Sequence, residues 1–185
     1  MNQFLIREAA RMVRQGGVVA YPTEGVYGLG CDPDNPLAVE RLLRLKGRSV
    51  AKGLILLASD WSDLAPFVSS LSSSEQERIL DSWPGAMTWL VPASSRSPVW
   101  LTGGGNRVAV RVTAHPVAAA LCRALGGGLV STSANRSGQP PARSALAVRR
   151  RFLEGGLDVI LHGALGNLSR PTPIRDALTG VWLRR

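Results

Sequence analysis

Three cations lie close together in one short segment of the sequence. Lys46 and Arg48 flank a glycine, and Lys52 follows shortly after them. An arginine can hold a phosphate or a carboxylate with two parallel hydrogen bonds, and a lysine adds a point charge. The segment therefore indicates an anion site. Basic residues at the end of a helix also complement its dipole, and the residues alone leave this structural alternative open.

Small polar residues follow an apolar, strand-like pair further along the chain. The run STSAN, residues 131–135, includes the hydroxyl of Ser133 and the amide of Asn135. Such groups at the end of a strand suit a polar ligand, although small polar residues are equally common in plain loops. Arg143 follows beyond two prolines, where the chain can return to the same site.

A further polar segment begins where a predicted strand ends. Residues 21–30 read YPTEGVYGLG, in which Thr23 offers a hydroxyl and Tyr27 an aromatic face. Gly28 and Gly30 allow a ligand to approach the backbone. Ligand sites of α/β proteins lie at such strand ends. The structural alternative is a strand-to-loop turn that holds a tyrosine for packing.

Two arginines share one face of a predicted strand. In the run RVAVR, the period of two places Val108 and Val110 on one face and Arg107 and Arg111 on the other. Two neighbouring arginines on one face are unfavourable unless an anion or an acid neutralises them. The run therefore indicates either an anion site or a strand face exposed to solvent.

Several familiar chemistries have no counterpart in the sequence. It contains no GxxxxGK[ST] segment, no GxGxxG after a strand and no GxSxG elbow. His115 and His162 have no metal-ligand spacing to each other or to a cysteine, so a zinc site is not expected. If the protein handles phosphates, it must use arginine, lysine, hydroxyl and backbone amide groups.

The elements that must position these residues alternate along the chain. Helices are predicted over 4–15, 36–46, 73–83, 116–125 and 145–152, and strands over 18–21, 54–57, 87–91, 108–112, 129–131 and 159–161. Asn35 and the pair Ser72 and Glu75 are the predicted helix starts, and Gly47 is a predicted helix stop. Two short strands joined at Thr179-Gly180 end the chain. This order predicts the α/β class with a mixed sheet.

Length and composition set further bounds. The 185 residues, of which 45% are hydrophobic, fit one domain over residues 1–185. The 22 Lys and Arg against 13 Asp and Glu give a net charge of +9, which favours phosphates, nucleotides or RNA as partners. Two distant cysteines fit a reducing compartment, and no apolar run reaches the length of a membrane span. We therefore expect a cytoplasmic protein with no membrane contact.

Together, in this order and spacing, the motifs resemble the YrdC-like threonylcarbamoyl-AMP synthase family in its short, single-domain bacterial form. The matching segments are YPTEGVYGLG, KGR with its trailing lysine, WPGAMTWLVPA, RVAVRV and STSAN. The resemblance implies a twisted mixed α/β sheet with flanking helices around a large concave basic cavity. It implies that L-threonine, bicarbonate or CO2 and ATP give threonylcarbamoyl-AMP and pyrophosphate. Transferase machinery proteins would then modify adenosine 37 of tRNAs that read ANN codons.

The resemblance also implies roles for individual residues. ATP would be bound by Lys46, Arg48, Lys52, Arg107, Asn135, Arg143 and Arg184. Threonine would be bound by Thr23, Tyr27, Arg111, Ser133 and Thr172. No catalytic group is assigned, since positioning and charge stabilisation by Lys46 and Arg48 would serve the reaction. Mg2+ is implied with ATP, without assigned protein ligands.

Two positions depart from the family pattern, and one rival function remains. Gly25 stands where many relatives have a threonine, and Pro173 departs from the usual residues after Thr172. Both departures bear on the affinity for threonine. The rival is a non-catalytic module that holds structured RNA in a basic cavity, which the positive charge supports equally well.

Overall fold

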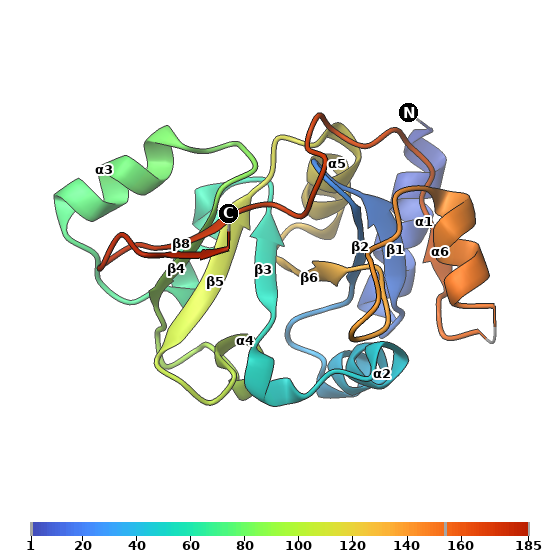
Figure 1. The fold of residues 1–185 in the computed structure, drawn as a ribbon, viewed down its shortest axis with the longest axis horizontal. Coiled ribbons are helices and arrows are strands. Elements are labelled where there is room, and N and C mark those ends of the chain that lie inside the picture. The colour runs from blue at the N-terminus through green and yellow to red at the C-terminus, as the bar shows by residue number, and fades with distance from the viewer. Residues whose placement is uncertain (1, 154, 185) are drawn as a thin grey trace.

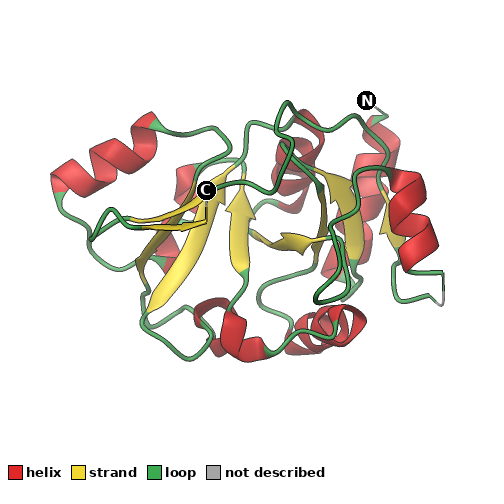
Figure 2. Cartoon of the chain, viewed as in Figure 1, coloured by secondary structure: helices red, strands yellow, loops and turns green. Residues whose placement is uncertain are grey.

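The chain folds around one twisted mixed sheet, which confirms the predicted α/β class (Figures 1 and 2). A computed structural model describes residues 2–153 and 155–184, so residues 1, 154 and 185 of the predicted domain lie outside the described residues. Among the described residues the sheet has nine strands in the order β7-β1-β2-β6-β3-β5-β4-β8-β9. Three neighbouring pairs, β1 with β7, β3 with β5 and β4 with β8, are parallel, and the others are antiparallel.

The strand bounds follow the apolar segments closely. They are β1 Val19–Pro22, β2 Tyr27–Gly30, β3 Ile55–Ala58, β4 Thr88–Pro92, β5 Arg107–Val112, β6 Leu129–Ser133, β7 Val159–Ile160, β8 Ile174–Asp176 and β9 Trp182–Arg184. The last two form the predicted terminal hairpin. Strand β2 was not predicted from the sequence.

The helices begin and end at the predicted signals in most cases. They are α1 Gln3–Arg14, α2 Pro36–Lys46, α3 Ser73–Asp81, α4 Val99–Thr102, α5 Pro116–Leu125 and α6 Ala145–Arg151, with short 3-10 turns at Val50–Lys52, Trp61–Asp63 and Ala65–Phe67. The predicted capping box closes at the start of α3, which ends two residues before the predicted position 83. Helix α4 and the 3-10 turns were not predicted.

Helix α2 shows how local signals place the first group of cations. The side chain of Asn35 accepts a hydrogen bond from the amide of Ala38 at 3.1 Å, which starts the helix. Gly47 ends it in the left-handed conformation at φ 59°, where a residue with a Cβ is strained. The chain reverses at this glycine, so Lys46 and Arg48 leave the helix end in different directions.

Two apolar layers cover the sheet, and one of them leaves part of its face open. Leu57 and Leu129 pack with α1 and α5 on one face. Because side chains alternate along a strand, Ile55, Ala109 and Ser131 lie on that same face beyond the helices. These residues line a pocket instead of a helix contact. The fold therefore leaves an open sheet area beside α5.

Candidate functional site

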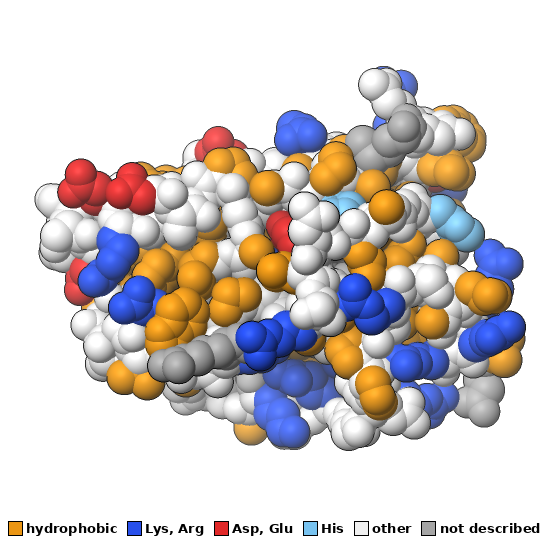
Figure 3. Space-filling model, turned by 45° about the horizontal axis from the view of Figure 1, so that its top comes forward, with side chains coloured by type: hydrophobic (Ala, Val, Ile, Leu, Met, Phe, Trp, Pro, Cys, Tyr) orange, Lys and Arg blue, Asp and Glu red, His pale blue; other side chains and the backbone are white. Residues whose placement is uncertain are grey.

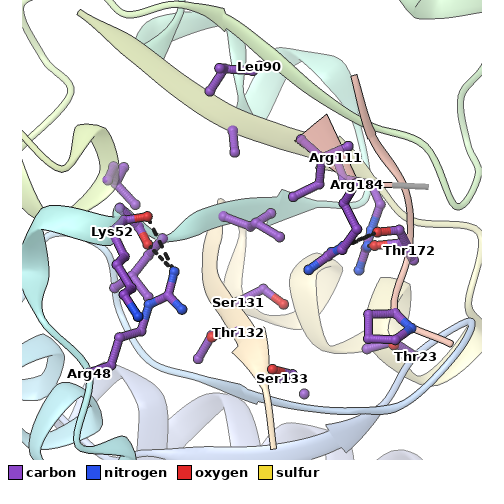
Figure 4. Close-up of a pocket in the computed structure, with 18 of the residues that line it drawn as sticks. Thr23, Arg48, Lys52, Leu90, Arg111, Ser131, Thr132, Ser133, Thr172 and Arg184 are labelled. Carbon is purple, nitrogen blue, oxygen red and sulfur yellow. Dashed lines mark hydrogen bonds between the residues drawn. The ribbon is translucent and has the colours of Figure 1, made fainter. Parts of the chain in front are cut away.

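The pocket on the open sheet face gathers most of the predicted site residues (Figure 4). Nine of the twelve line it, and they come from segments that are far apart in the sequence: Thr23, Tyr27, Arg48, Lys52, Arg107, Arg111, Ser133, Thr172 and Arg184. The pocket volume is about 190 Å³. This lies below the roughly 300 Å³ at which pockets for drug-sized ligands begin, so the expectation of a large cavity is not confirmed.

Strand β5 carries the two arginines as the alternation predicts. Val108 and Val110 are fully buried in the core, and Arg107 and Arg111 line the pocket on the opposite face. An acid contacts each of the two arginines, which is one of the ways to neutralise them that the sequence left open. Arg107 forms an ion pair with Asp176 of β8.

Arg111 is the most buried of the arginines that line the pocket and is only 3% exposed. Its guanidinium lies 3.6 Å from the carboxylate of Glu24 and donates to the hydroxyls of Thr172 and Thr88. Glu24 also accepts a hydrogen bond from the hydroxyl of Thr113 at 2.5 Å. These contacts fix the plane of the guanidinium before any ligand arrives.

Arg184 and Thr172 form the same end of the pocket (Figure 4). The guanidinium of Arg184 donates to the backbone carbonyl of Thr172 at 2.9 and 2.7 Å. Burial lowers the pKa of Arg184, and the nearby charges of Arg111 and Arg48 lower it further. Arginine stays protonated in proteins, so this shift means that burial and the neighbouring cations make the charge of Arg184 unfavourable at this position.

Arg48 and Lys52 lie at the opposite end of the pocket, where the chain leaves α2 (Figure 4). The guanidinium of Arg48 donates to the backbone carbonyl of Gly53 at 2.9 Å and to that of Lys52 at 3.3 Å. Its Nε atom is buried without a hydrogen-bond partner. Burial lowers the pKa of Arg48. An anion at this end would relieve the cost of holding the charge there.

The basic character extends beyond the pocket itself. Figure 3 shows Lys and Arg side chains gathered over the lower part of this face, while the acidic side chains in view lie mostly toward one end.

Among the residues that the structure describes, no group of three or more His, Cys, Asp or Glu could hold a metal ion.

Three predicted site residues lie beside the pocket and not along its wall. The ammonium of Lys46 donates to the carbonyls of Ser133 and Asn135. Lys46 was predicted to face the phosphates of ATP, but it is not among the residues that line the pocket. Asn135 shares this contact through its side-chain oxygen. Arg143 uses its guanidinium on the carbonyls of Gly25 and Ser169. In all three residues the nitrogen donors are hydrogen-bonded to oxygens of the protein.

Residues 163–173, here called the strap, connect β7 to β8 (Figure 1), and Pro171 and Thr172 of this segment line the pocket. The amide of Gly166 donates to the backbone carbonyl of Thr23 at 3.1 Å, and the amide of Leu168 donates to the backbone carbonyl of Glu24 at 3.0 Å. A Cβ at Gly25 would lie 2.0 Å from the carbonyl oxygen of Arg170. The strap therefore occupies the space that a threonine side chain at position 25 would need.

Several residues of the site were not among those predicted from the sequence. Glu24 and Asp176 are the acids that neutralise the two arginines of β5, and Ser131 and Thr132 line the pocket between its two ends. The unfavourable arginine pair was a signal that acids must lie nearby. It did not identify them, because both acids are distant in sequence.

Comparisons with known proteins agree on one family. The family model Sua5/YciO/YrdC, described as "Telomere recombination", matches residues 11–185. A protein named threonylcarbamoyl-AMP synthase from Halorhodospira halophila is 58% identical over 182 residues, covering 98% of this chain and 95% of its own. A protein of the same name from Nitrosococcus oceani is 55% identical over 179 residues, covering 97% and 96%.

Solved structures show the same fold. Sua5 of P. abyssi complexed with L-threonine matches with a TM-score of 0.89 and 32% identity over 95% of this chain, which spans about half of that longer protein (52%). E. coli YciO matches with a TM-score of 0.83 and 31% identity, covering 100% of this chain and 90% of its own. The predicted family resemblance is confirmed.

Proposed function

We propose that this chain, which belongs to the Sua5/YciO/YrdC family, is a threonylcarbamoyl-AMP synthase. Its reaction joins L-threonine, bicarbonate or CO2 and ATP into threonylcarbamoyl-AMP and releases pyrophosphate. Relatives with this name are 50–58% identical over nearly the whole chain. We further propose that residues 1–185 act as one domain, since a single sheet contributes to both ends of the pocket.

One observation carries the proposal: three guanidinium groups, one of them buried and two of them half-buried, face one pocket without enough acid to balance them. Arg48, Arg111 and Arg184 line it, and only Arg111 has a carboxylate partner there. Bringing like charges together in a poorly solvated site is unfavourable unless an anion binds. Substrates with a carboxylate and several phosphates supply that charge.

The end of the pocket at Arg111 suits the amino acid. A fixed guanidinium favours a carboxylate, and the hydroxyls of Thr23, Ser133 and Thr172 suit the remaining polar groups of threonine. Tyr27 belongs to this proposed subsite as part of the wall. The P. abyssi relative crystallised with L-threonine supports the ligand class.

The opposite end suits the phosphates of ATP. Arg48 and Lys52 would hold them, Arg184 would reach the nucleotide from the amino-acid end, and Arg107 and Asn135 would lie on the nucleotide side. A nucleotide extends beyond a pocket of about 190 Å³, so its remainder would lie along the basic surface near Lys52. Arg143 donates to the carbonyls of Gly25 and Ser169, so it would hold the strap against the segment at Gly25.

The chemistry requires positioning and charge stabilisation more than a protein nucleophile. The amine of threonine adds to CO2 and loses a proton, which gives a carbamate. A carbamate oxygen attacks the α-phosphorus of ATP, and pyrophosphate leaves with the electron pair of the broken bond. Arginine and lysine groups would stabilise the charge that develops on the phosphates.

Mg2+ would enter this reaction with the nucleotide. The two acids nearest the pocket, Glu24 and Asp176, are paired with Arg111 and Arg107. The described lining therefore offers no ligand set for a resident cation.

The product would pass to transferase proteins that modify tRNA, as the family function implies. A cytoplasmic location and a direct tRNA contact through the basic surface are parts of this proposal. Among the described residues, no helix is both long and apolar enough to cross a bilayer.

Pyrophosphate release tests the function directly. The full chain should release pyrophosphate only when ATP, threonine and bicarbonate are all present. Arg48→Ala should abolish this release because it removes a pocket cation. Arg44→Ala is the matched control, since Arg44 lies on the preceding helix α2 and pairs with exposed Glu40 at its surface. An RNA-binding module would instead ignore all three substrates and bind RNA with a steep salt dependence.

A further inference from the structure

Lys46 is an unusual lysine because the fold buries its charge at the end of α2. It is 2% exposed and is the last residue of the helix. Burial lowers its pKa to about 8, and the charge of Arg48 contributes to the shift. A buried ammonium persists in proteins when it is well hydrogen-bonded.

The ammonium of Lys46 has no donor left for a ligand. An ammonium carries three N–H groups. They reach three oxygens: the carbonyl of Ser133, the carbonyl of Asn135 at 2.9 Å and the side-chain oxygen of Asn135 at 3.3 Å. The backbone joins the same loop to the helix, because the amide of Ser137 donates to the carbonyl of Lys46 at 2.7 Å.

The side chain of Asn135 is oriented from both ends. Its oxygen faces Lys46, and its nitrogen donates to the carbonyls of Arg136 at 2.9 Å and Gln139 at 2.8 Å. These partners allow only one orientation of the amide. The oxygen also accepts the hydroxyl proton of Ser133 at 2.6 Å.

This arrangement determines what Ser133 can offer to a ligand. A hydroxyl has one proton to donate, and that of Ser133 is directed at Asn135. Ser133 lines the pocket, so it meets the ligand with its lone pairs (Figure 4). It therefore suits a ligand group that donates, such as an amine or a hydroxyl, and does not suit a phosphate or a carboxylate.

We propose that Lys46 is a positioning residue that, through Asn135, makes Ser133 a hydrogen-bond acceptor for the amine or hydroxyl of the amino-acid substrate. Lys46 thus acts on the amino-acid side of the site and does not bind phosphate. This inference rests on the proposed function for the identity of the amino acid. The arrangement of the three side chains stands independently of it.

A double-mutant cycle on threonine affinity tests the coupling. Lys46→Met removes the ammonium and keeps the length of the side chain, and Ser133→Ala removes the acceptor. Each change should weaken threonine binding by about tenfold, as expected for one lost hydrogen bond to a charged or oriented group. In the double variant, Lys46→Met should add less than about twofold to the effect of Ser133→Ala. Fully multiplicative effects would overturn the proposal.

Tripolyphosphate binding separates positioning from phosphate contact. Lys46→Met should keep the wild-type affinity for this probe within about twofold, whereas Lys52→Met, which removes a cation from the pocket wall, should weaken it by about tenfold. An equal loss in both variants would show that Lys46 binds phosphate directly. Asn135→Leu provides a second test of the cycle should Lys46→Met fail to fold.

A third measurement does not depend on the substrate. Hydrogen exchange at the amide of Ser137 should accelerate in Lys46→Met, because the loop loses the ammonium that holds it. If wild-type protein released no pyrophosphate and bound no threonine, the proposed function would fail, while this exchange result would still decide whether Lys46 orders the loop. Unchanged exchange would contradict the positioning role.

Discussion

The buried pair of Glu24 and Arg111 provides a sharp test of how the site is built. Their side chains are 11% and 4% exposed, and the ion-pair distance is 3.6 Å. Glu24→Gln keeps the shape of the side chain and can keep the hydrogen bond from Thr113. It removes only the negative charge, so any effect reports on the pairing with Arg111.

The distance gives the size of the expected loss. With an effective dielectric constant near 20, two unit charges at this separation attract each other by about 5 kcal/mol. Removing one member of a buried pair typically costs about 3–5 kcal/mol, because the other charge is left uncompensated. We expect the lower end, about 3 kcal/mol, because Arg111 also donates to Thr172 and Thr88. For a chain of this size, that lowers the melting temperature by about 6–12 °C.

Thermal unfolding monitored by circular dichroism measures the loss. Glu40→Gln is the matched control, because it removes a carboxylate from an exposed pair with Arg44. Exposed pairs contribute little, so the control should melt close to the wild type. Equal melting temperatures for Glu24→Gln and the control would refute the view that this pair holds the arginine in place.

Four further predictions concern single residues. Gly25→Ala should lower the free energy of unfolding in urea by about 2 kcal/mol, because the new methyl group would lie 2.0 Å from the carbonyl of Arg170. Gly47→Ala should cost only about 1 kcal/mol, because its conformation is left-handed but no atom lies within 4 Å of the new methyl group. Tyr27→Phe should cost about 1 kcal/mol in the same assay, since its hydroxyl donates to a strap carbonyl at 2.9 Å. Between about pH 8, the pKa of Lys46 in the folded protein, and 10.5, its ordinary pKa, Lys46 binds its proton more tightly in the unfolded state. The free energy of unfolding of the wild type should therefore rise over this pH range relative to that of Lys46→Met, by about 1.4 kcal/mol per pH unit. A difference between the two proteins that stays constant with pH would contradict this.

Local signals predicted much of the fold because they act within a few residues. The Asn35 cap, the stop at Gly47 and the capping box of α3 are all present as predicted. The alternation in β5 also held, since burial of Val108 and Val110 leaves the arginines no other face. Such features depend on backbone geometry and on side-chain period, which a sequence displays directly.

Strand β2 shows where prediction of secondary structure from the local sequence fails. Its two glycines suggest a loop, because glycine weakens strands in general. In the structure a Cβ at Gly28 would lie 3.2 Å from the ring of Tyr21, so the small residue lets the buried tyrosine pack against the neighbouring strand. β2 is a strand because β1 and β6 lie on its two sides. Pairing with segments distant in sequence decides this, and propensity does not.

The cation motif shows the same limit within the site. Lys46 and Arg48 are two residues apart and have the same charge, so the sequence predicts one role for both. Their environments differ because the helix ends between them at Gly47. Lys46 still belongs to the helix and turns toward the oxygens of the 133–135 loop, whereas Arg48 has left it and lies on the pocket wall. A charge motif therefore predicts that an anion site is near, and the position of the helix end determines which cation can reach the anion.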